Sequence, residues 1–158
     1  MTMKKRLFSV FFTLLLTFTC AIPSVFASEY SNIRQSNEGI VFLQDGSYII
    51  STIQENSCIS LYATTHTKSG SKTSTVYSAS GSPLYSITVH GVFSYNGSSA
   101  SAISASYSYT DESPLWSFSN GSSSFSGATA TASGTFKSGQ ITKTLRAVLS
   151  CSANGTLS

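Results

Sequence analysis

The chain has 158 residues, of which 41% are apolar, 12% aromatic and only 9% charged, and its formal net charge is +3. This length fits one domain, and the composition excludes a polybasic nucleic-acid binder and a charged disordered tail. Lys4, Lys5 and Arg6 belong to an N-terminal segment that we expect to be removed, after which six basic side chains balance six acidic ones. We therefore expect no binding to nucleic acid and no electrostatic attachment to an anionic membrane.

The first 27 residues have the three parts of a secretory signal peptide. A basic start precedes an apolar run, and Val25-Phe26-Ala27 is a small-residue cleavage pattern. We predict cleavage after Ala27, export, and no membrane span in the mature chain, because a spanning helix needs about 20 consecutive apolar residues. Residues 28–37 lack periodicity and are predicted to be a flexible leader, which leaves residues 38–158 as a single domain.

An exported protein folds where cysteines can form disulfides. Cys58 and Cys151 remain in the mature chain, and an even pair in an exported protein predicts one disulfide. Such a bridge closes a loop of about 90 residues and contributes roughly 4 to 5 kcal/mol in the chain-entropy description. The alternative to the disulfide is that both thiols are buried and reduced. A separate alternative to plain secretion is lipid attachment at Cys20, although Phe18-Thr19 before it lacks the usual Leu-small-small lead-in.

The first elements after the leader form a predicted β-hairpin. Residues 39–43 and 48–53 flank Asp45-Gly46, a pair that supplies the positive φ angle of a tight turn. Three further elements are expected: a strand over residues 58–67, a polar loop over 68–73 and a shorter strand over 73–78.

The most regular alternation of ring-bearing and hydroxyl side chains lies in residues 84–95 and 99–110, which flank Asn96-Gly97 and predict a second hairpin. Gly91 interrupts the apolar row and indicates a bulge. The apolar row of the first strand is Tyr85, Ile87, Val89, Phe93 and Tyr95, opposite Ser86, Thr88, His90 and Ser94. The return strand places Ser101, Ile103, Ala105, Tyr107 and Tyr109 on one side.

Two more units follow. Residues 115–133 alternate around Trp116 and Phe118, with Asn120-Gly121 as the expected turn and a return from Phe125. Residues 128–136 and 141–151 form a last hairpin around residues 137–140. No apolar pattern at helical spacing persists, so almost no helix is expected outside the signal.

About eight short strands separated by turn residues predict an all-β, antiparallel β-sandwich, with a small β-barrel as the alternative. Cys58 on an early strand and Cys151 on the last resemble the inter-sheet bridge of immunoglobulin-like sandwiches. Trp116 lies nearer the second cysteine than the buried Trp of an antibody domain, and Leu149 stands where that family has tyrosine. The resemblance therefore implies an immunoglobulin-like architecture without family membership.

Little in the mature chain points to catalysis. Its two histidines, His66 and His90, fall in polar rows, and no Gly-x-Ser-x-Gly elbow is present. Asp111-Glu112 lie in a turn composition with Ser113-Pro114, and adjacent strand residues point to opposite faces, which disfavours a glycosidase carboxylate pair. No Cys/His cluster or run of alternating acids predicts a metal site. We expect a non-enzymatic protein without cofactor or metal.

The aromatic residues offer the best candidate ligand site. Sugar rings stack on exposed Trp or Tyr faces, and Trp116, Tyr107 and Tyr109 are the candidates for such a platform. The alternative interpretation is that these rings form the core, because a domain poor in Leu and Val must bury large side chains of another kind. The core interpretation is favoured.

We predict a secreted, non-enzymatic binding or interaction module whose partner is an extracellular protein or glycan. Weakly charged, hydroxyl-rich strands support this prediction because few charges guard their edges against pairing with other chains. The alternatives are a carbohydrate-binding module that uses exposed aromatics, and a small secreted toxin, bacteriocin or inhibitor. The signal, the Asp45-Gly46 hairpin, the Ser/Tyr body and the Cys-Ser-Ala-Asn-Gly ending resemble small exported β-rich proteins of Gram-positive bacteria, which implies no particular activity.

Overall fold

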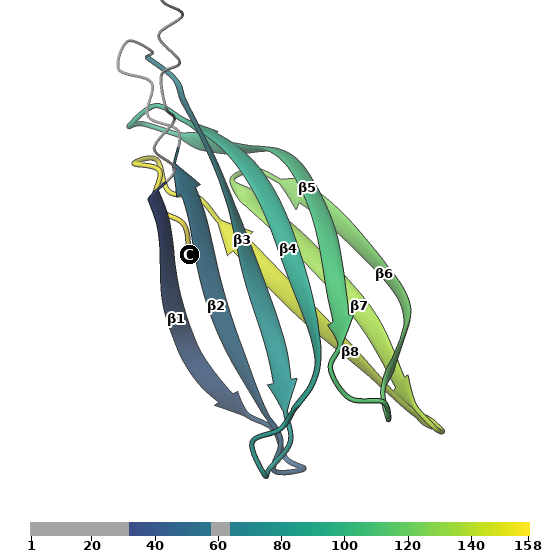
Figure 1. Ribbon diagram of the computed structural model, residues 1–158. Coiled ribbons are helices and arrows are strands. Elements are labelled where there is room, and N and C mark those ends of the chain that lie inside the picture. Colours follow the sequence, from purple (N-terminus) through teal and green to yellow (C-terminus); the bar gives the residue numbers. More distant parts are fainter. Residues whose placement is uncertain (1–31, 58–63) are drawn as a thin grey trace, which may run out of the picture.

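The structure, a computed structural model, describes residues 32–57 and 64–158, and the side chains of this part except those of residues 32–38 and 57. The predicted signal peptide, its cleavage site and Cys58 lie outside the described residues. In the described part every regular element is a β-strand (Figure 1). No helix of membrane-spanning length and apolarity occurs there. The strands are β1 (Asn32–Phe42), β2 (Tyr48–Ser57), β3 (His66–Tyr77), β4 (Pro83–Tyr95), β5 (Ala100–Asp111), β6 (Ser117–Ser126), β7 (Thr129–Ser138) and β8 (Ile141–Ser150).

The strands form two antiparallel sheets that follow the order of the chain. β1 to β5 make a five-stranded sheet, which we call sheet A, and β6 to β8 make a three-stranded sheet, sheet B (Figure 1). The predicted all-β sandwich is therefore confirmed, and the alternative of a closed barrel is wrong, because the described strands make two separate sheets. Every hydrogen-bonded neighbour is a sequence neighbour, so the likeness to an immunoglobulin domain ends at the two-sheet architecture and does not include Greek-key connections.

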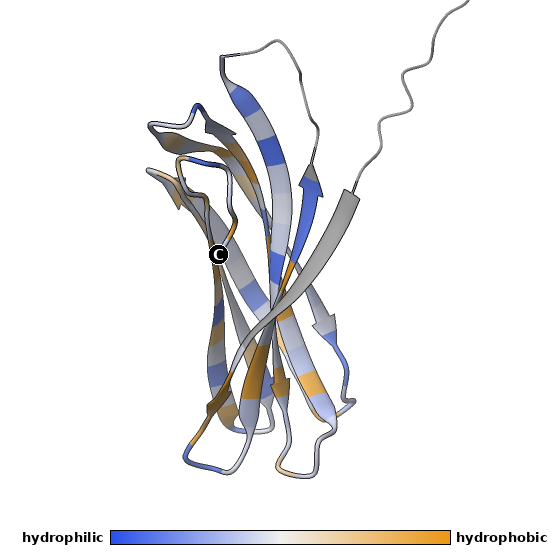
Figure 2. Cartoon of the chain, turned by 90° about the vertical axis from the view of Figure 1, so that its left-hand side faces the viewer, coloured by the Kyte–Doolittle hydropathy of each residue, from blue (hydrophilic) through white to orange (hydrophobic). Residues whose placement is uncertain are grey.

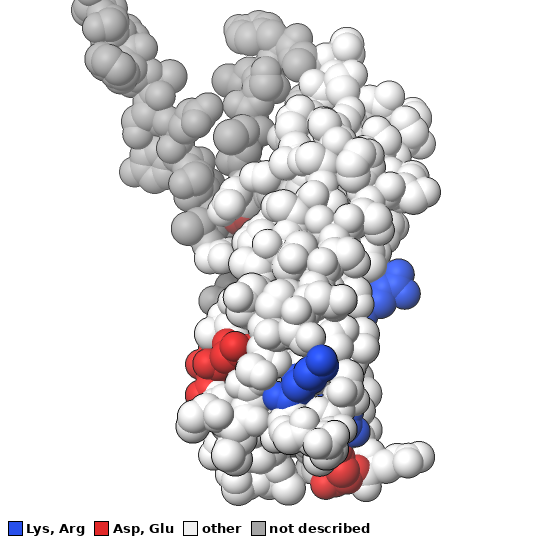
Figure 3. All heavy atoms as spheres, turned by 90° about the vertical axis from the view of Figure 1, so that its right-hand side faces the viewer, with Lys and Arg blue, Asp and Glu red and all other residues white. Residues whose placement is uncertain are grey.

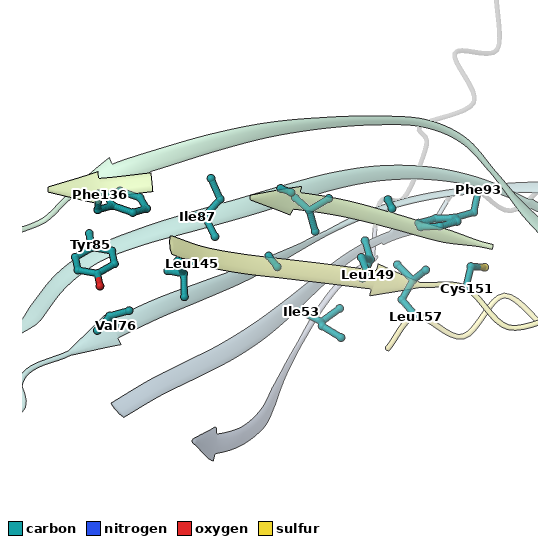
Figure 4. Packing of buried hydrophobic residues seen from close by; sticks show 14 residues of the cluster. Ile53, Val76, Tyr85, Ile87, Phe93, Phe136, Leu145, Leu149, Cys151 and Leu157 are labelled. Carbon is teal, nitrogen blue, oxygen red and sulfur yellow. The ribbon is translucent and has the colours of Figure 1, made fainter. Parts of the chain in front are cut away.

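The core lies between the two sheets. Alternate residues of β4, β7 and β8 point into this layer, which is why the apolar rows predicted from period-two spacing are buried. Figure 4 shows these side chains meeting from both sheets. The fully buried large side chains are Phe93, Phe136, Ile53, Ile87, Leu149 and Val89.

The hairpin of β4 and β5 is confirmed, but one predicted face of β5 is wrong. Gly97 has a φ of 85°, and the side chain of Asn96 accepts a hydrogen bond from the backbone N–H of Ser99 at 2.9 Å. Val92 pairs with Ser104 and Phe93 pairs with Ala102, which leaves Ile103 as an extra residue in a β-bulge. The bulge reverses the alternation on its N-terminal side, so that Ala102 and not Ile103 faces the core.

Two predicted irregular segments are strands. β3 runs without interruption through residues 68–73, expected as a polar loop, and pairs with β2 on one side and β4 on the other. β1 begins at Asn32, so residues 32–37, expected as a flexible leader, pair with β2. Neither segment has alternating apolar residues. Both form strands because their backbones make hydrogen bonds to a neighbouring strand.

The predicted turn at Asn120-Gly121 is also wrong, because β6 continues through both residues. Gly121 lies opposite Gly134 of β7, and two rings occupy the space above it. A Cβ on Gly121 would come within 2.8 Å of Phe118 Cζ and of Tyr107 Cε2. This glycine makes room for aromatic rings within a strand, and the chain reverses at Gly127, whose φ is 55°.

After β8 the chain folds back on itself, and we call residues 151–158 the C-terminal return. Cys151 pairs with Leu157, and the return lies against β2 and β3 of sheet A. Lys68 Nζ donates to the backbone oxygen of Gly155 at 2.7 Å and forms an ion pair with Glu55 at 2.9 Å. Glu55 in turn accepts a hydrogen bond from the backbone N–H of Leu157 at 3.3 Å, so the return is held by polar contacts as well as by the buried Leu157 side chain.

Candidate binding surfaces

The three aromatic candidates belong to one group of rings, which we call the aromatic cluster. Tyr109 and Tyr107 of β5 contact Phe118 of β6, while Trp116 contacts Tyr85 of β4. Phe136 of β7 joins the two halves, because it stacks on Tyr85 at 4.4 Å between centroids and meets Phe118 edge-on at 5.5 Å. The cluster comprises Tyr85, Tyr107, Tyr109, Trp116, Phe118 and Phe136.

The members of the aromatic cluster differ in exposure. Trp116 and Tyr107 are half-buried and pack against the core. Tyr109 is 48% exposed, and its ring lies flat on Phe118, with 3.6 Å between centroids and 8° between planes. Of the three candidates, therefore, only Tyr109 offers a largely accessible ring.

Burial affects two ionisable groups of the core. It raises the pKa of the Tyr85 hydroxyl above its usual value of 10.0, and the nearby Asp45 carboxylate adds to the shift. In reduced Cys151, burial also raises the pKa of the thiol above 9.0, against the opposing effect of Lys68. Both groups are therefore neutral at pH 7, which suits their place in an apolar layer.

A second surface consists of three consecutive apolar residues on β1, and we call Ile40, Val41 and Phe42 the β1 edge patch. These side chains are 55%, 59% and 74% exposed. β1 is the edge strand of sheet A, and no other strand of the described residues pairs with its outer side. The described end of β1 is coloured as hydrophobic in the view of Figure 2. Runs of exposed apolar residues on an open edge are unusual in monomers, because such an edge pairs readily with another chain.

The edge of sheet B that β8 forms is protected by charge. Lys143 and Arg146 of β8 are exposed, and Lys143 also lies 3.5 Å from Asp45 in the turn between β1 and β2. Charged side chains on an edge strand oppose pairing with a second chain, because their desolvation is costly. The three members of the β1 edge patch are all apolar, and the charged residues of β1, Arg34 and Glu38, precede the patch in the strand.

The third surface is the outer face of sheet A, where short hydroxyl side chains from β3, β4 and β5 form cross-strand rows. Thr73 and Thr88 share a hydrogen bond of 2.8 Å, and His90 Nε2 and Ser108 Oγ lie 2.9 Å apart. The side of the molecule at the right of Figure 1, which Figure 3 shows, carries few and scattered charged side chains. The hydroxyl rows on the outer face of sheet A are suited to neutral, hydrogen-bonding ligands.

The residues considered for catalysis have local contacts. His66 packs its ring against Tyr95, with 5.4 Å between centroids, and Asp111 accepts a hydrogen bond from the backbone N–H of Phe118 at 3.1 Å. Asp111 therefore fixes the connection between β5 and β6, in line with the predicted turn there. In residues 32–57 and 64–158, no group of three or more His, Cys, Asp or Glu side chains is placed to hold a metal ion.

Sequence reasoning did not identify the β1 edge patch as a surface. Ile40 and its neighbours were expected in a strand, but apolar residues in a strand usually indicate a buried face. The order of strands in the sheet decides which of them is an edge, and that order follows from pairing between whole strands.

Comparisons with protein-family models, with curated proteins and with solved structures found no match.

Proposed function

We propose that the mature chain is an exported, non-enzymatic interaction module that associates by adding a strand to the edge of β1. The observation that carries this proposal is the β1 edge patch, where Ile40, Val41 and Phe42 lie exposed on a strand whose outer side pairs with no other described strand. Strand addition satisfies the open backbone groups of the edge and removes these side chains from water at the same time.

The partner that fits this edge best is a second copy of the chain. An antiparallel pair of identical edges is related by a twofold axis, and an axis through Val41 places Ile40 of each copy opposite Phe42 of the other. No charged side chain of the patch opposes such pairing. Phe42 already packs against Tyr48, which stacks on Tyr77, so Ile40 of the second copy would continue this cross-strand row beside Phe42. The contact is short, and we expect weak, concentration-dependent association.

The test compares Ile40→Lys with Ile103→Lys. Both isoleucines are about half exposed, at 55% and 50%, but Ile103 lies in the bulge of β5 and outside the patch. Sedimentation velocity of the mature protein, from micromolar to millimolar concentration, should show a monomer–dimer equilibrium for the wild type and for Ile103→Lys. Ile40→Lys should remain monomeric throughout, because pairing would desolvate its ammonium group.

Circular dichroism of both variants controls for folding. A wild-type protein that stays monomeric at millimolar concentration would overturn the proposal. Equal dimerisation of the wild type, Ile40→Lys and Ile103→Lys would place the interface elsewhere and overturn it as well.

A second candidate function, carbohydrate binding, is favoured by the position of Tyr109. Its ring is supported from behind by Phe118 and half exposed, which is the arrangement in which an aromatic face stacks on a sugar ring. Trp116 and Tyr107 support the cluster from its buried side in this proposal. Substitution Tyr109→Ala separates this site from any other sugar site and is included in the titrations described below.

We also propose the Cys58–Cys151 disulfide. Cys58 directly follows β2 in the sequence, and Cys151 is buried where the C-terminal return packs on Glu55 of β2. The mature protein should weigh two hydrogens less than its reduced form, and reduction should lower the free energy of unfolding by about 2 to 5 kcal/mol. Intact mass and denaturation with and without reductant test this. Two thiols that react with an alkylating agent in the unreduced, denatured protein would contradict it.

A further inference from the structure

The outer face of sheet A contains a hollow of about 150 Å³ that neither proposed interaction uses. It spans four strands in two cross-strand rows, in which Ser69 and Ser71 of β3 lie beside Val92 and His90 of β4. The walls of the hollow are mostly short side chains, and the main chain at Gly70 and Gly91 contributes to its lining. The hollow is lined by Asn56, Ser69, Gly70, Ser71, His90, Gly91, Val92, Ser104 and Ser106.

The lining combines three kinds of group. Serine hydroxyls and the amide of Asn56 both donate and accept hydrogen bonds. In a neutral imidazole such as that of His90, one ring nitrogen donates and the other accepts. Val92 is apolar. None of the described side chains that line the hollow is a carboxylate, an ammonium or a guanidinium group. A ligand with a net charge therefore finds no counter-ion here and loses hydration on entry.

A neutral ring with several hydroxyl groups matches this lining. Each ligand hydroxyl needs a partner that donates or accepts as required, and the serines satisfy either role. One apolar side chain can cover a C–H face of the ring. The volume is well below the roughly 300–1,000 Å³ of sites that enclose a drug-sized molecule, so the hollow admits one ring and leaves the rest of a longer chain outside.

His90 is held in place within this site. Its Nε2 lies 2.9 Å from Ser108 Oγ, on β5, and Ser108 does not line the hollow. This hydrogen bond uses one ring nitrogen and leaves the other available to a ligand. Paired β-strands position both residues, so the site needs no loop to close over it.

We propose that this hollow binds a single neutral pyranose ring, free or at the end of a glycan, through hydrogen bonds from Asn56, His90 and the surrounding serines. The site is separate from Tyr109 and does not depend on association through β1. With one small ring bound on an open face, the dissociation constant should lie in the millimolar range.

The experiment titrates the mature, ¹⁵N-labelled protein with methyl glycosides of glucose, galactose, mannose and N-acetylglucosamine. At least one glycoside should shift the amide signals of residues that line the hollow, and an oligosaccharide ending in that sugar tests whether a glycan end is also accepted. Glucuronic acid is the charged counterpart and should bind at least several-fold more weakly.

Two matched substitutions locate the site. Ser106→Phe fills the hollow and should abolish the shifts, whereas Ser101→Phe introduces the same side chain at an exposed position of β5 outside the lining and should leave them unchanged. His90→Ala should weaken binding several-fold. Tyr109→Ala should have no effect.

Several results would overturn the proposal. The absence of shifts at the hollow up to about 100 mM of every neutral glycoside would exclude even weak binding. Binding that survives Ser106→Phe would exclude the hollow, and its loss in Tyr109→Ala would then assign the sugar to the aromatic cluster. A monomeric wild type with a sugar-binding hollow would refute the association through β1 and leave this inference standing.

Discussion

Replacing Phe136 by alanine is expected to lower the free energy of unfolding by about 3 to 5 kcal/mol. Phe136 is fully buried, and its ring joins the two halves of the aromatic cluster by contacts with Tyr85 and Phe118. Truncation removes the burial of one large ring, leaves a cavity between the sheets, and deprives two further rings of their packing partner. Since small domains are stable by about 5–15 kcal/mol, this loss is a large part of the total.

Denaturation in urea, followed by the fluorescence of Trp116 and by circular dichroism, measures the change. Phe125→Ala is the matched control, because Phe125 lies at the exposed end of β6 and outside the core. Its effect should stay within about 0.5 kcal/mol, as for other exposed substitutions. Equal losses for the two variants would show that the aromatic cluster does not link the sheets as described.

Leu157→Ala is expected to cost about 2 to 5 kcal/mol, although the residue is the last but one of the sequence. Its side chain is buried over Gly70 of β3, where any Cβ at position 70 would collide with it. The loss has two origins. Removal of the leucine side chain leaves a cavity against β2 and β3. It also loosens the C-terminal return, which weakens the hydrogen bonds that Glu55 and Lys68 make to the backbone of the return.

The control for this substitution is Leu115→Ala, at an exposed position in the connection between β5 and β6. Urea denaturation of the two variants at equal protein concentration should separate them by at least about 2 kcal/mol. If Leu157→Ala were as stable as Leu115→Ala, the C-terminal return would not be part of the core.

Period-two spacing predicted the strands whose two faces differ most. β4, β7 and the second half of β8 alternate fully buried residues with more accessible ones, and the turns at Asp45-Gly46 and Asn96-Gly97 have glycines at positive φ as expected. In these segments local turn chemistry and the pattern of burial agree. The fold class could therefore be predicted from the sequence, because it needs only the number and kind of strands.

The errors arose where contacts distant in sequence decide the local structure. Asn120-Gly121 has the composition of a hairpin turn, but the rings of Phe118 and Tyr107 require a glycine at that point of a strand. Ile103 falls in the predicted inward row, yet a bulge opposite β4 turns it outward. Neither a ring packed over a glycine nor a bulge changes the period-two pattern of a single strand, so neither could be predicted from that pattern.

The candidate sites were predictable to different degrees. Tyr107, Tyr109 and Trp116 do belong to one cluster, and their aromatic character was sufficient to select them. The β1 edge patch and the hollow depend on strand order and on register across four strands, and both are properties of the assembled sheet. Serines that line the hollow are indistinguishable in sequence from the many that do not.

The sequential order of the strands has a consequence for how the molecule can be divided. Each sheet is built from one continuous piece of chain, residues 32–111 for sheet A and 117–150 for sheet B, and residues 112–116 are the covalent link between them. A cut in that link would sever no strand ladder. The two fragments would recognise each other through the aromatic cluster and the C-terminal return, so the protein is suited to splitting into halves that reassemble when mixed.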